Sequence, residues 1–235
     1  MSLKQTSSLV FLVLFCFSGM SQDQTRLNSK DNLGRKQGYW KSFDEMGYLK
    51  YEGTFKNDIP VDTFKYYYPD GKLRALSIFY NEGKQSRTKL YHRNEKIMAE
   101  GNYLNQKKDS IWKYYSEYDG VLLSEEIYVN NQKNGLWKQF FPNGKVAEEI
   151  NYKNDVEDGE WKQFYTDGTK KLDGFYVRGL KEGLIQMFYP NGQVETTGTY
   201  LHSLKEGVWR YFSEDGKNTK DELYKNGKLV SKFEK

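Results

Sequence analysis

The sequence predicts an all-β repeat protein: eight β-hairpin units of 24 residues that form an elongated, twisted, single-layer antiparallel meander sheet. Three observations support this prediction. Aromatic residues make up 17% of the 235 residues, with 20 Tyr and only 5 Met, and such a composition favours strands over helices. Two aromatic positions recur with the 24-residue period, and a turn motif stands between them.

All five tryptophans occupy one position of the repeat, which we call the anchor. They are separated by 72, 25, 24 and 48 residues, multiples of 24 apart from one inserted residue. Three units have another residue at this position. The eight anchors are Trp40, Phe64, Thr88, Trp112, Trp137, Trp161, Ile185 and Trp209.

Two further columns are aromatic in every unit, so the period defines eight complete units. The tip column lies three residues after the anchor, and the return column lies fifteen residues after it, or sixteen in the fourth unit, which holds the insertion. The tip column is Phe43, Tyr67, Tyr91, Tyr115, Phe140, Phe164, Phe188 and Phe212. The return column is Phe55, Phe79, Tyr103, Tyr128, Tyr152, Tyr176, Tyr200 and Tyr224.

A turn motif stands between the two columns. In Pro69-Asp70-Gly71 and its equivalents, proline presets φ, Asp or Asn suits the second position, and Gly takes the left-handed conformation, which predicts a three-residue hairpin loop. The third unit has Glu95 in place of the glycine, so we expect a strained or altered turn there. A second turn, such as Asn57-Asp58, closes most units, giving about sixteen strands.

The loop length also predicts the register, because the residue before the turn pairs with the residue after it. Successive side chains of a strand point to opposite faces of the sheet. Counted from the tip pair, this alternation places the return column on the same face as the tip column, together with a recurrent Lys such as Lys41. It places the Trp column on the other face with the acids Glu52, Glu100, Glu125 and Glu149. The predicted tip pairs are Phe43 with Leu49, Tyr67 with Leu73, Tyr91 with Ile97, Tyr115 with Leu122, Phe140 with Val146 and Phe188 with Val194.

The first 21 residues have the features of a secretory signal peptide: Lys4, an apolar run over 9–17, and small residues before Gln22. We therefore expect a signal peptide over 1–21, a polar linker over 22–35, a repeat domain over 36–235, and a secreted or periplasmic protein. Phe15 fits poorly with a lipoprotein signal, so we expect no lipid anchor at Cys16.

The side-chain inventory argues against an enzyme, and we predict no catalytic residue, metal or cofactor. Two His and one Cys leave little for a zinc site, a thiol nucleophile or a disulfide framework. The net charge of +4 is spread along the chain, which argues against a nucleic-acid partner. An enzyme would need residues that break the repeat, and only Thr88 and the irregular turn of its unit do so.

Segments such as Gly38-Tyr39-Trp40-Lys41, Gly159-Glu160-Trp161-Lys162 and Gly207-Val208-Trp209-Arg210 resemble MORN-repeat variants. The resemblance covers about residues 36–232 and is to repeats found in YwqK-type antitoxins of toxin–antitoxin systems. It implies protein–protein contacts and, in some relatives, contacts with membrane lipids. The antitoxin label implies a toxin as the partner.

These observations predict a secreted, non-enzymatic scaffold that binds an unknown protein partner, which by the family resemblance is a toxin. The alternative is a module that binds cell-wall glycan or membrane lipid through its aromatic columns. We rank packing between units above ligand binding for the Trp column, because repeat units stack on one another. The candidate residues for a binding surface or a packing ladder are Trp40, Trp112, Trp137, Trp161, Trp209, Tyr67, Tyr115, Phe140, Phe164 and Phe188.

Overall fold

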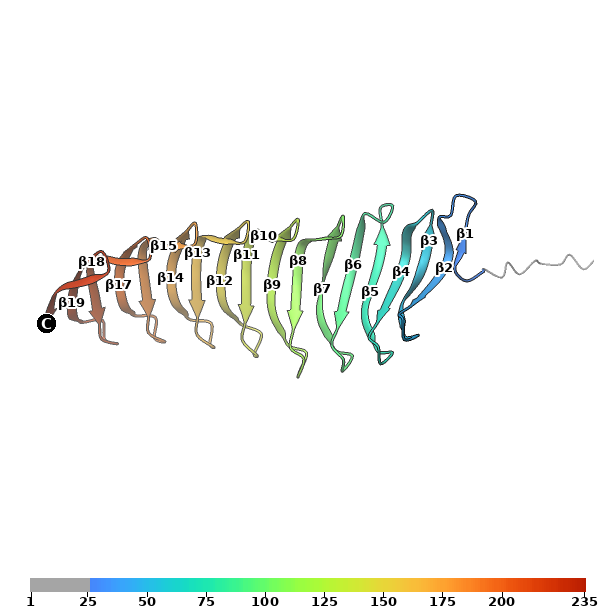
Figure 1. Cartoon of the computed structure of the whole chain (residues 1–235). Helices are drawn as coiled ribbons and strands as arrows, with labels where there is room; N and C mark the ends of the chain where they lie inside the picture. Colours follow the sequence, from blue (N-terminus) through green and yellow to red (C-terminus); the bar gives the residue numbers. More distant parts are fainter. Residues whose placement is uncertain (1–25) are drawn as a thin grey trace, which may run out of the picture.

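The computed structural model describes residues 26–235, which form one long sheet without a helix (Figure 1). The expected signal peptide lies outside the described residues, and none of the described residues forms a helix that could cross a membrane. The twenty strands are β1 (Ser29–Lys30), β2 (Lys36–Phe43), β3 (Leu49–Lys56), β4 (Ile59–Tyr67), β5 (Leu73–Tyr80), β6 (Gln85–Tyr91), β7 (Ile97–Leu104), β8 (Lys107–Tyr115), β9 (Leu122–Val129), β10 (Gln132–Lys133), β11 (Gly135–Phe140), β12 (Val146–Lys153), β13 (Val156–Phe164), β14 (Lys170–Val177), β15 (Leu180–Lys181), β16 (Gly183–Phe188), β17 (Val194–Leu201), β18 (Leu204–Phe212), β19 (Asn218–Lys225) and β20 (Lys228–Glu234).

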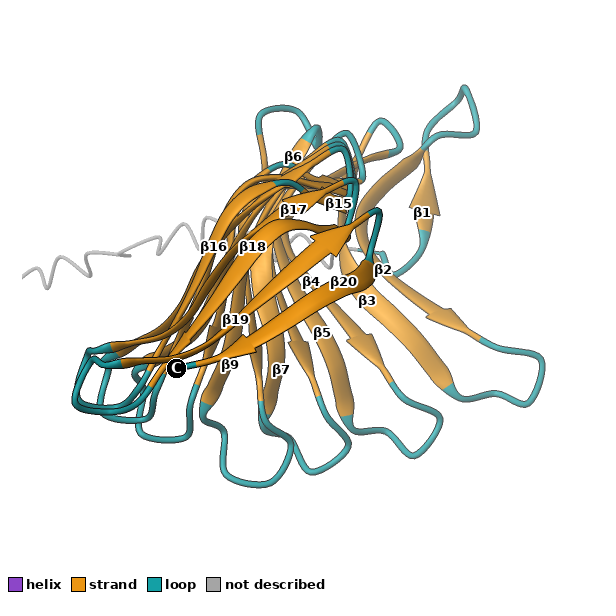
Figure 2. Ribbon diagram, turned by 90° about the vertical axis from the view of Figure 1, so that its left-hand side faces the viewer, coloured by secondary structure: helices purple, strands orange, loops and turns teal. Residues whose placement is uncertain are grey.

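The sheet is an antiparallel meander in which strands pair in chain order, as the repeat predicts. β10 and β11 both pair with β9, and β15 and β16 both pair with β14, so each couple is one interrupted strand. The eight hairpins run from β2/β3 to β18/β19, with β1 added before them and β20 after them. β1 and the turn that follows it lie within the segment 22–35. Figure 2 shows the strands fanning out along the row, which is the twist expected of such a sheet.

The hairpin loops confirm the predicted turn and tip register. Tyr68 donates its N–H to the carbonyl of Lys72, Gly71 donates to the carbonyl of Tyr68, and Gly71 has a φ of 83°. All six predicted tip pairs are formed. Glu95 adopts a φ of 68° with the same two hydrogen bonds, so its turn keeps the shape of the glycine turns despite the unfavourable residue.

The face predicted for the return column is wrong. Phe43 pairs with Leu49 but Ser42 pairs with Tyr51, so Lys50 is an extra residue that shifts the alternation by one. The return column therefore shares the face of the Trp column, where the rings of Trp40 and Phe55 lie 6.1 Å apart.

The same shift moves the acids to the other side of the sheet. Glu52 pairs with Lys41 and accepts a hydrogen bond from the tip-column residue Tyr67. We call the side with the anchors and return column the Trp face. The side with the tip column and the Lys–Glu pairs is the open face.

A second irregularity bends the first strand of most hairpins near the anchor. Between β3 and β4 the register shifts by two residues, and Asp62, two before the anchor Phe64, has a φ of 57°. The other residues at this position with positive φ are Gly38, Ser110, Gly135, Gly159, Gly183 and Gly207. The third unit lacks this bulge, because β5 and β6 pair without a shift and Ser77 lies opposite Thr88.

The two residues absent from that bulge lengthen the neighbouring turn instead. The connection between β3 and β4 is a two-residue turn, Asn57-Asp58, with both φ values positive. The connection between β5 and β6 has four residues, because Tyr80 pairs with Gln85. The third unit thus differs from its neighbours in strand, turn and anchor together.

Candidate functional site

The anchor rings form a packed ladder along the Trp face. The ring of Trp112 lies against Gly101 of the preceding unit, so closely that a Cβ on Gly101 would stand 2.4 Å from it. Gly198 bears the same relation to Trp209, at 2.2 Å. Trp112 is 0% exposed and Trp209 is 1% exposed, although the sheet has only one layer. At these two positions a glycine of the preceding unit leaves the space that the anchor ring fills.

Return-column rings fill the space between successive anchors. The Phe55 ring lies 6.1 Å from Trp40 and 5.0 Å from Phe64, both in edge-to-face geometry. Tyr103 packs against Trp112 in the same way at 4.9 Å. Such contacts stabilise aromatic pairs beyond the area that they bury.

A row of lysines covers this ladder on the side of the connecting turns. The ammonium group of Lys205 lies 4.2 Å from the Trp209 ring centroid, and Lys36 and Lys108 cover Trp40 and Trp112 at 5.0 and 4.8 Å. Burial lowers the pKa of Lys205. In the sequence, this row corresponds to a Lys four residues before most anchors. The anchor, tip and return columns do not include this position, so they do not reveal the row.

The open face is a ladder of ion pairs beside the tip column. Lys41 pairs with Glu52 at 3.4 Å and Lys113 with Glu125 at 3.0 Å. Tyr115 donates its hydroxyl proton to Glu100 at 2.7 Å, and burial together with this carboxylate raises the Tyr115 pKa to about 12. The ion pairs lie within single hairpins, the Tyr115–Glu100 bond joins neighbouring units, and all of these groups are partly exposed to solvent.

The ten candidate residues therefore lie on two sides of the sheet. Trp112, Trp161 and Trp209 are buried, and the other two tryptophans are half-buried. The tip-column candidates lie on the open face, where they are also half-buried. These five are Tyr67, Tyr115, Phe140, Phe164 and Phe188.

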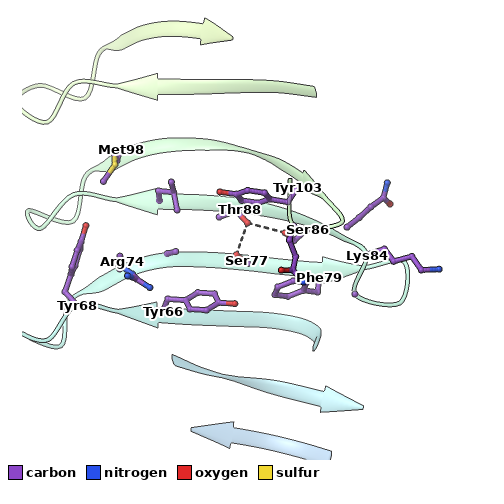
Figure 3. A pocket seen from close by; sticks show the side chains of 15 residues that line it. Tyr66, Tyr68, Arg74, Ser77, Phe79, Lys84, Ser86, Thr88, Met98 and Tyr103 are labelled. Atoms are coloured by element: carbon purple, nitrogen blue, oxygen red, sulfur yellow. Dashed lines mark hydrogen bonds between the residues drawn. The ribbon is translucent and has the colours of Figure 1, made fainter. Parts of the chain in front are cut away.

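The ladder is interrupted at the third unit, where a hollow of about 560 Å³ opens on the Trp face (Figure 3). Its floor consists of three buried hydroxyl residues, Ser77, Ser86 and Thr88. The Thr88 Oγ1 lies 2.8 Å from the Ser77 Oγ and 3.4 Å from the Ser86 Oγ. Thr88 stands out in the sequence, but its two partners depend on the unbulged register of β5 and β6.

Aromatic and aliphatic side chains form the walls of this hollow. Phe79 and Tyr103 lie on two sides of the hydroxyl chain (Figure 3). Tyr66 and Leu90 also line the hollow, each one residue before the end of its strand and so near a hairpin loop. Burial raises the pKa values of Tyr66 and Tyr103. Lys84, the last residue of the long connecting turn, lies at the mouth.

The polar groups of the hollow are hydroxyls, amides and cations. Its lining includes Ser77, Ser86, Thr88, Arg74 and Lys84 but no Asp, Glu or His. His92 and His202 lie in a hairpin loop and a connecting turn of different units. Within residues 26–235, no group of three or more His, Cys, Asp or Glu side chains is placed to hold a metal ion.

Four segments of the chain match one protein-family model, that of the MORN repeat variant: residues 63–82, 133–154, 157–178 and 181–202. These segments are MORN repeat variants. The last three begin four residues before their anchors and are 24 residues apart, in the register of the hairpins. A search of curated proteins found no match to the chain. The protein is thus an all-β scaffold that contains MORN repeat variants, and the matched description names no toxin or antitoxin.

Proposed function

We propose that the protein is a secreted, non-enzymatic scaffold that binds a protein partner along its open face. The observation that supports this most directly is a row of exposed apolar side chains beside the Lys–Glu pairs. Ile111 is 49% exposed and Leu184 is 60% exposed, each one residue before an anchor. Apolar side chains grouped on an exposed surface mark interaction sites in soluble proteins.

The row extends over most of the sheet. Cross-strand partners one residue before the return column add to it, because Val208 pairs with Leu223 and Ile111 pairs with Ile127. Two shallow hollows lie along it, one lined by Phe175 and Leu184 and the other by residues that include Ile111. An apolar row flanked by charged pairs has the composition of a protein-binding surface.

Hydrogen bonds between successive hairpin loops link the units along the edge of the sheet. Tyr165 donates its hydroxyl proton to the carbonyl of Phe188 in the next unit at 2.7 Å, and Tyr189 does so to Phe212 at 2.8 Å. The Asn143 side chain in one hairpin loop donates to the carbonyl of Thr166 in the next loop. A surface ordered before binding loses less entropy when a partner docks.

The proposed partner class and compartment rest on features of the sequence. The signal-like segment over 1–21 supports secretion, and a toxin is the partner class that the antitoxin resemblance implies. Binding of glycan or lipid by the Trp column has less support, because Trp112 and Trp209 are buried and cannot stack on a ligand without unfolding.

The test compares the wild-type protein with an open-face variant, Ile111→Asp with Leu184→Asp and Val208→Asp. Each protein is immobilised and exposed to the native envelope fraction, and retained proteins are identified by mass spectrometry. We expect the wild type to retain a specific protein. The amount of that protein retained by the open-face variant should be at least about tenfold lower.

The matched control places Asp at Leu33, Met46 and Tyr118, which are exposed in loops outside the strands of the open face. Circular dichroism checks that both variants fold. Equal retention by all three proteins, or retention of the wild type on purified peptidoglycan or anionic vesicles alone, would contradict the proposal.

A further inference from the structure

The hollow at Thr88 occupies the place that an aromatic ring fills in most other units. The anchors of the adjacent units, Phe64 and Trp112, are 2% and 0% exposed. Each lies on a glycine of the preceding unit, Gly53 or Gly101. In the third unit the anchor is Thr88 and the residue opposite it is Ser77, so both sides of the site are small. The result is a space one repeat wide within a continuous row of rings.

The walls of this space are rings that lack one of their usual neighbours. Phe55, a regular return-column residue, contacts the anchor of its own unit and the anchor of the next. Phe79 contacts the anchor of its own unit, Phe64, at 5.2 Å, but the next anchor is Thr88, which has no ring. Tyr103 contacts the next anchor, Trp112, but the anchor of its own unit is Thr88. Both rings therefore border the hollow on the side where a regular unit has a third ring.

The floor supplies hydrogen-bond acceptors. Ser77, Ser86 and Thr88 form a chain of three hydroxyl groups with Thr88 in the middle. Each hydroxyl oxygen has two lone pairs and one proton, so three hydroxyls that bond only to one another retain free acceptor sites. An N–H or O–H group of a ligand can use these sites. The ring N–H of Trp112 has a comparable partner, the carbonyl of Asn102 at 2.9 Å.

We propose that this hollow binds a small molecule with an aromatic ring that carries a hydrogen-bond donor, of the indole or phenol class. The ring occupies the gap in the row between Phe79 and Tyr103, and its donor points to the hydroxyl chain. The volume of about 560 Å³ lies in the range of small-molecule pockets, about 300–1,000 Å³, and leaves room for a substituent toward Tyr66 and Leu90. The site is on the Trp face and does not depend on partner binding at the open face.

Calorimetric titration of the purified protein with indole is the first test. We expect saturable binding at one site per chain. N-methylindole, which lacks the donor, should bind about fivefold more weakly, as expected for the loss of one hydrogen bond. Nuclear Overhauser contacts from indole to the methyl groups of Thr88 and Leu90 should place the ring in the wild-type protein. Absence of binding, or contacts to another part of the chain, would overturn the proposal.

A pair of variants tests the position independently. Thr88→Trp supplies the missing ring from the protein itself, so it should reduce indole affinity at least about tenfold. Thr63→Trp adds the same ring at an exposed site one residue before the Phe64 anchor, on the open face, and should leave the affinity unchanged. Melting curves check that both variants fold. Equal indole affinity in the two variants would overturn the assignment of the site.

Two further probes distinguish the source and class of the ligand. A five-residue peptide with a central Trp flanked by Ser and Gly should bind no more tightly than indole. If it binds at least about tenfold more tightly, the occupant is a side chain of a partner and the assignment to a free molecule is wrong. Binding of N-acetylglucosamine without binding of indole would show a sugar site instead. The open-face triple variant should retain indole binding, which separates this test from that of the proposed function.

Discussion

The eighth and third units share a hairpin loop and a strand pairing, but they fill the Trp face differently. In the eighth unit Trp209 lies against Gly198, Lys205 covers its ring, and the indole N–H donates to the Thr199 carbonyl at 3.2 Å. In the third unit Thr88 faces Ser77 across the strands. The comparison shows that ring, glycine, lysine and bulge occur together at the anchor of the eighth unit, and that the anchor of the third unit lacks the ring, the glycine and the bulge.

The largest expected effect comes from removing the ring of the regular unit. Trp209→Ala should destabilise the protein by about 3–5 kcal/mol, because it leaves a cavity beside Gly198 that neighbouring side chains cannot fill. Thr88→Ala should cost only about 1 kcal/mol, since it removes one hydroxyl partner at a site that is already open. Urea unfolding followed by circular dichroism measures both. Similar losses for the two variants would show that the third unit packs like the others.

A smaller effect is expected when the space under a ring is filled. Gly101→Ala should destabilise by about 1–3 kcal/mol, because its Cβ would stand 2.4 Å from the buried Trp112 ring and the ring would have to move. Gly174→Ala is the matched control. Its Cβ would stand 3.2 Å from the nearest atom, on Trp161, and a small adjustment suffices. If thermal melts rank the two variants in the opposite order, the close approach of ring and glycine is not what stabilises the ladder.

The sequence predicts the repeat, the hairpin loops and the tip pairs because each depends on local signals. Pro69-Asp70-Gly71 determines its turn, and the turn determines that Tyr67 meets Leu73. The side of the sheet on which the return column lies has no such signal. It depends on the extra residue, Lys50 in the first unit, which differs in no obvious way from other surface lysines.

The candidate site is predictable only in part. Thr88 is identified as a break in the Trp column, but Ser86 joins it only because the third unit has no bulge there. In other units a residue with positive φ occupies that position, as Gly207 does. In the sequence, the glycines two before the anchor resemble ordinary strand or turn glycines. Their left-handed conformation is a property of the bulge, which two strands create together.

The hairpin loops give a third prediction, because the third unit has Glu95 where the fifth has Gly144. Glu95→Gly should stabilise the protein by up to about 1 kcal/mol, since φ is 68° and the hydrogen bonds are those of the glycine turns. Gly144→Val should destabilise by about 1–2 kcal/mol. A Cβ at Gly144 would meet no atom within 4 Å, so the effect isolates the cost of φ = 80° for a β-branched residue. A neutral Glu95→Gly, measured by thermal melts, would show that the glutamate side chain compensates for its backbone.

The smallest expected effect concerns Glu222, which occupies in the eighth unit the position that Ser77 occupies in the second. The carboxylate is buried and accepts hydrogen bonds from the hydroxyls of Tyr211 and Tyr224 at 2.7 and 2.9 Å. The Tyr211 bond and the Lys220 ammonium group at 2.9 Å lower the Glu222 pKa from 4.5 to about 2. Because the pKa is lower in the folded state, this contribution to stability is complete above about pH 4.5. It is lost as the pH falls toward 2.

Glu222→Gln keeps the size of the side chain and removes its charge. At pH 7 the melting temperature should fall by on the order of 3 °C, the shift that about 1 kcal/mol produces in a domain of this size. The difference from the wild type should shrink below about pH 4.5 and approach zero only below about pH 2, where the wild-type carboxyl becomes protonated as well. Glu214→Gln, an exposed change in the hairpin loop of the same unit, serves as the control and should show no such trend. A difference in melting temperature that stays constant from pH 7 to pH 2 would mean that Glu222 acts through packing. In that case the charge of Glu222, which contacts Tyr211 and Lys220, would add no stability. The eighth unit would then gain nothing from having a carboxylate at the position that Ser77 occupies in the second.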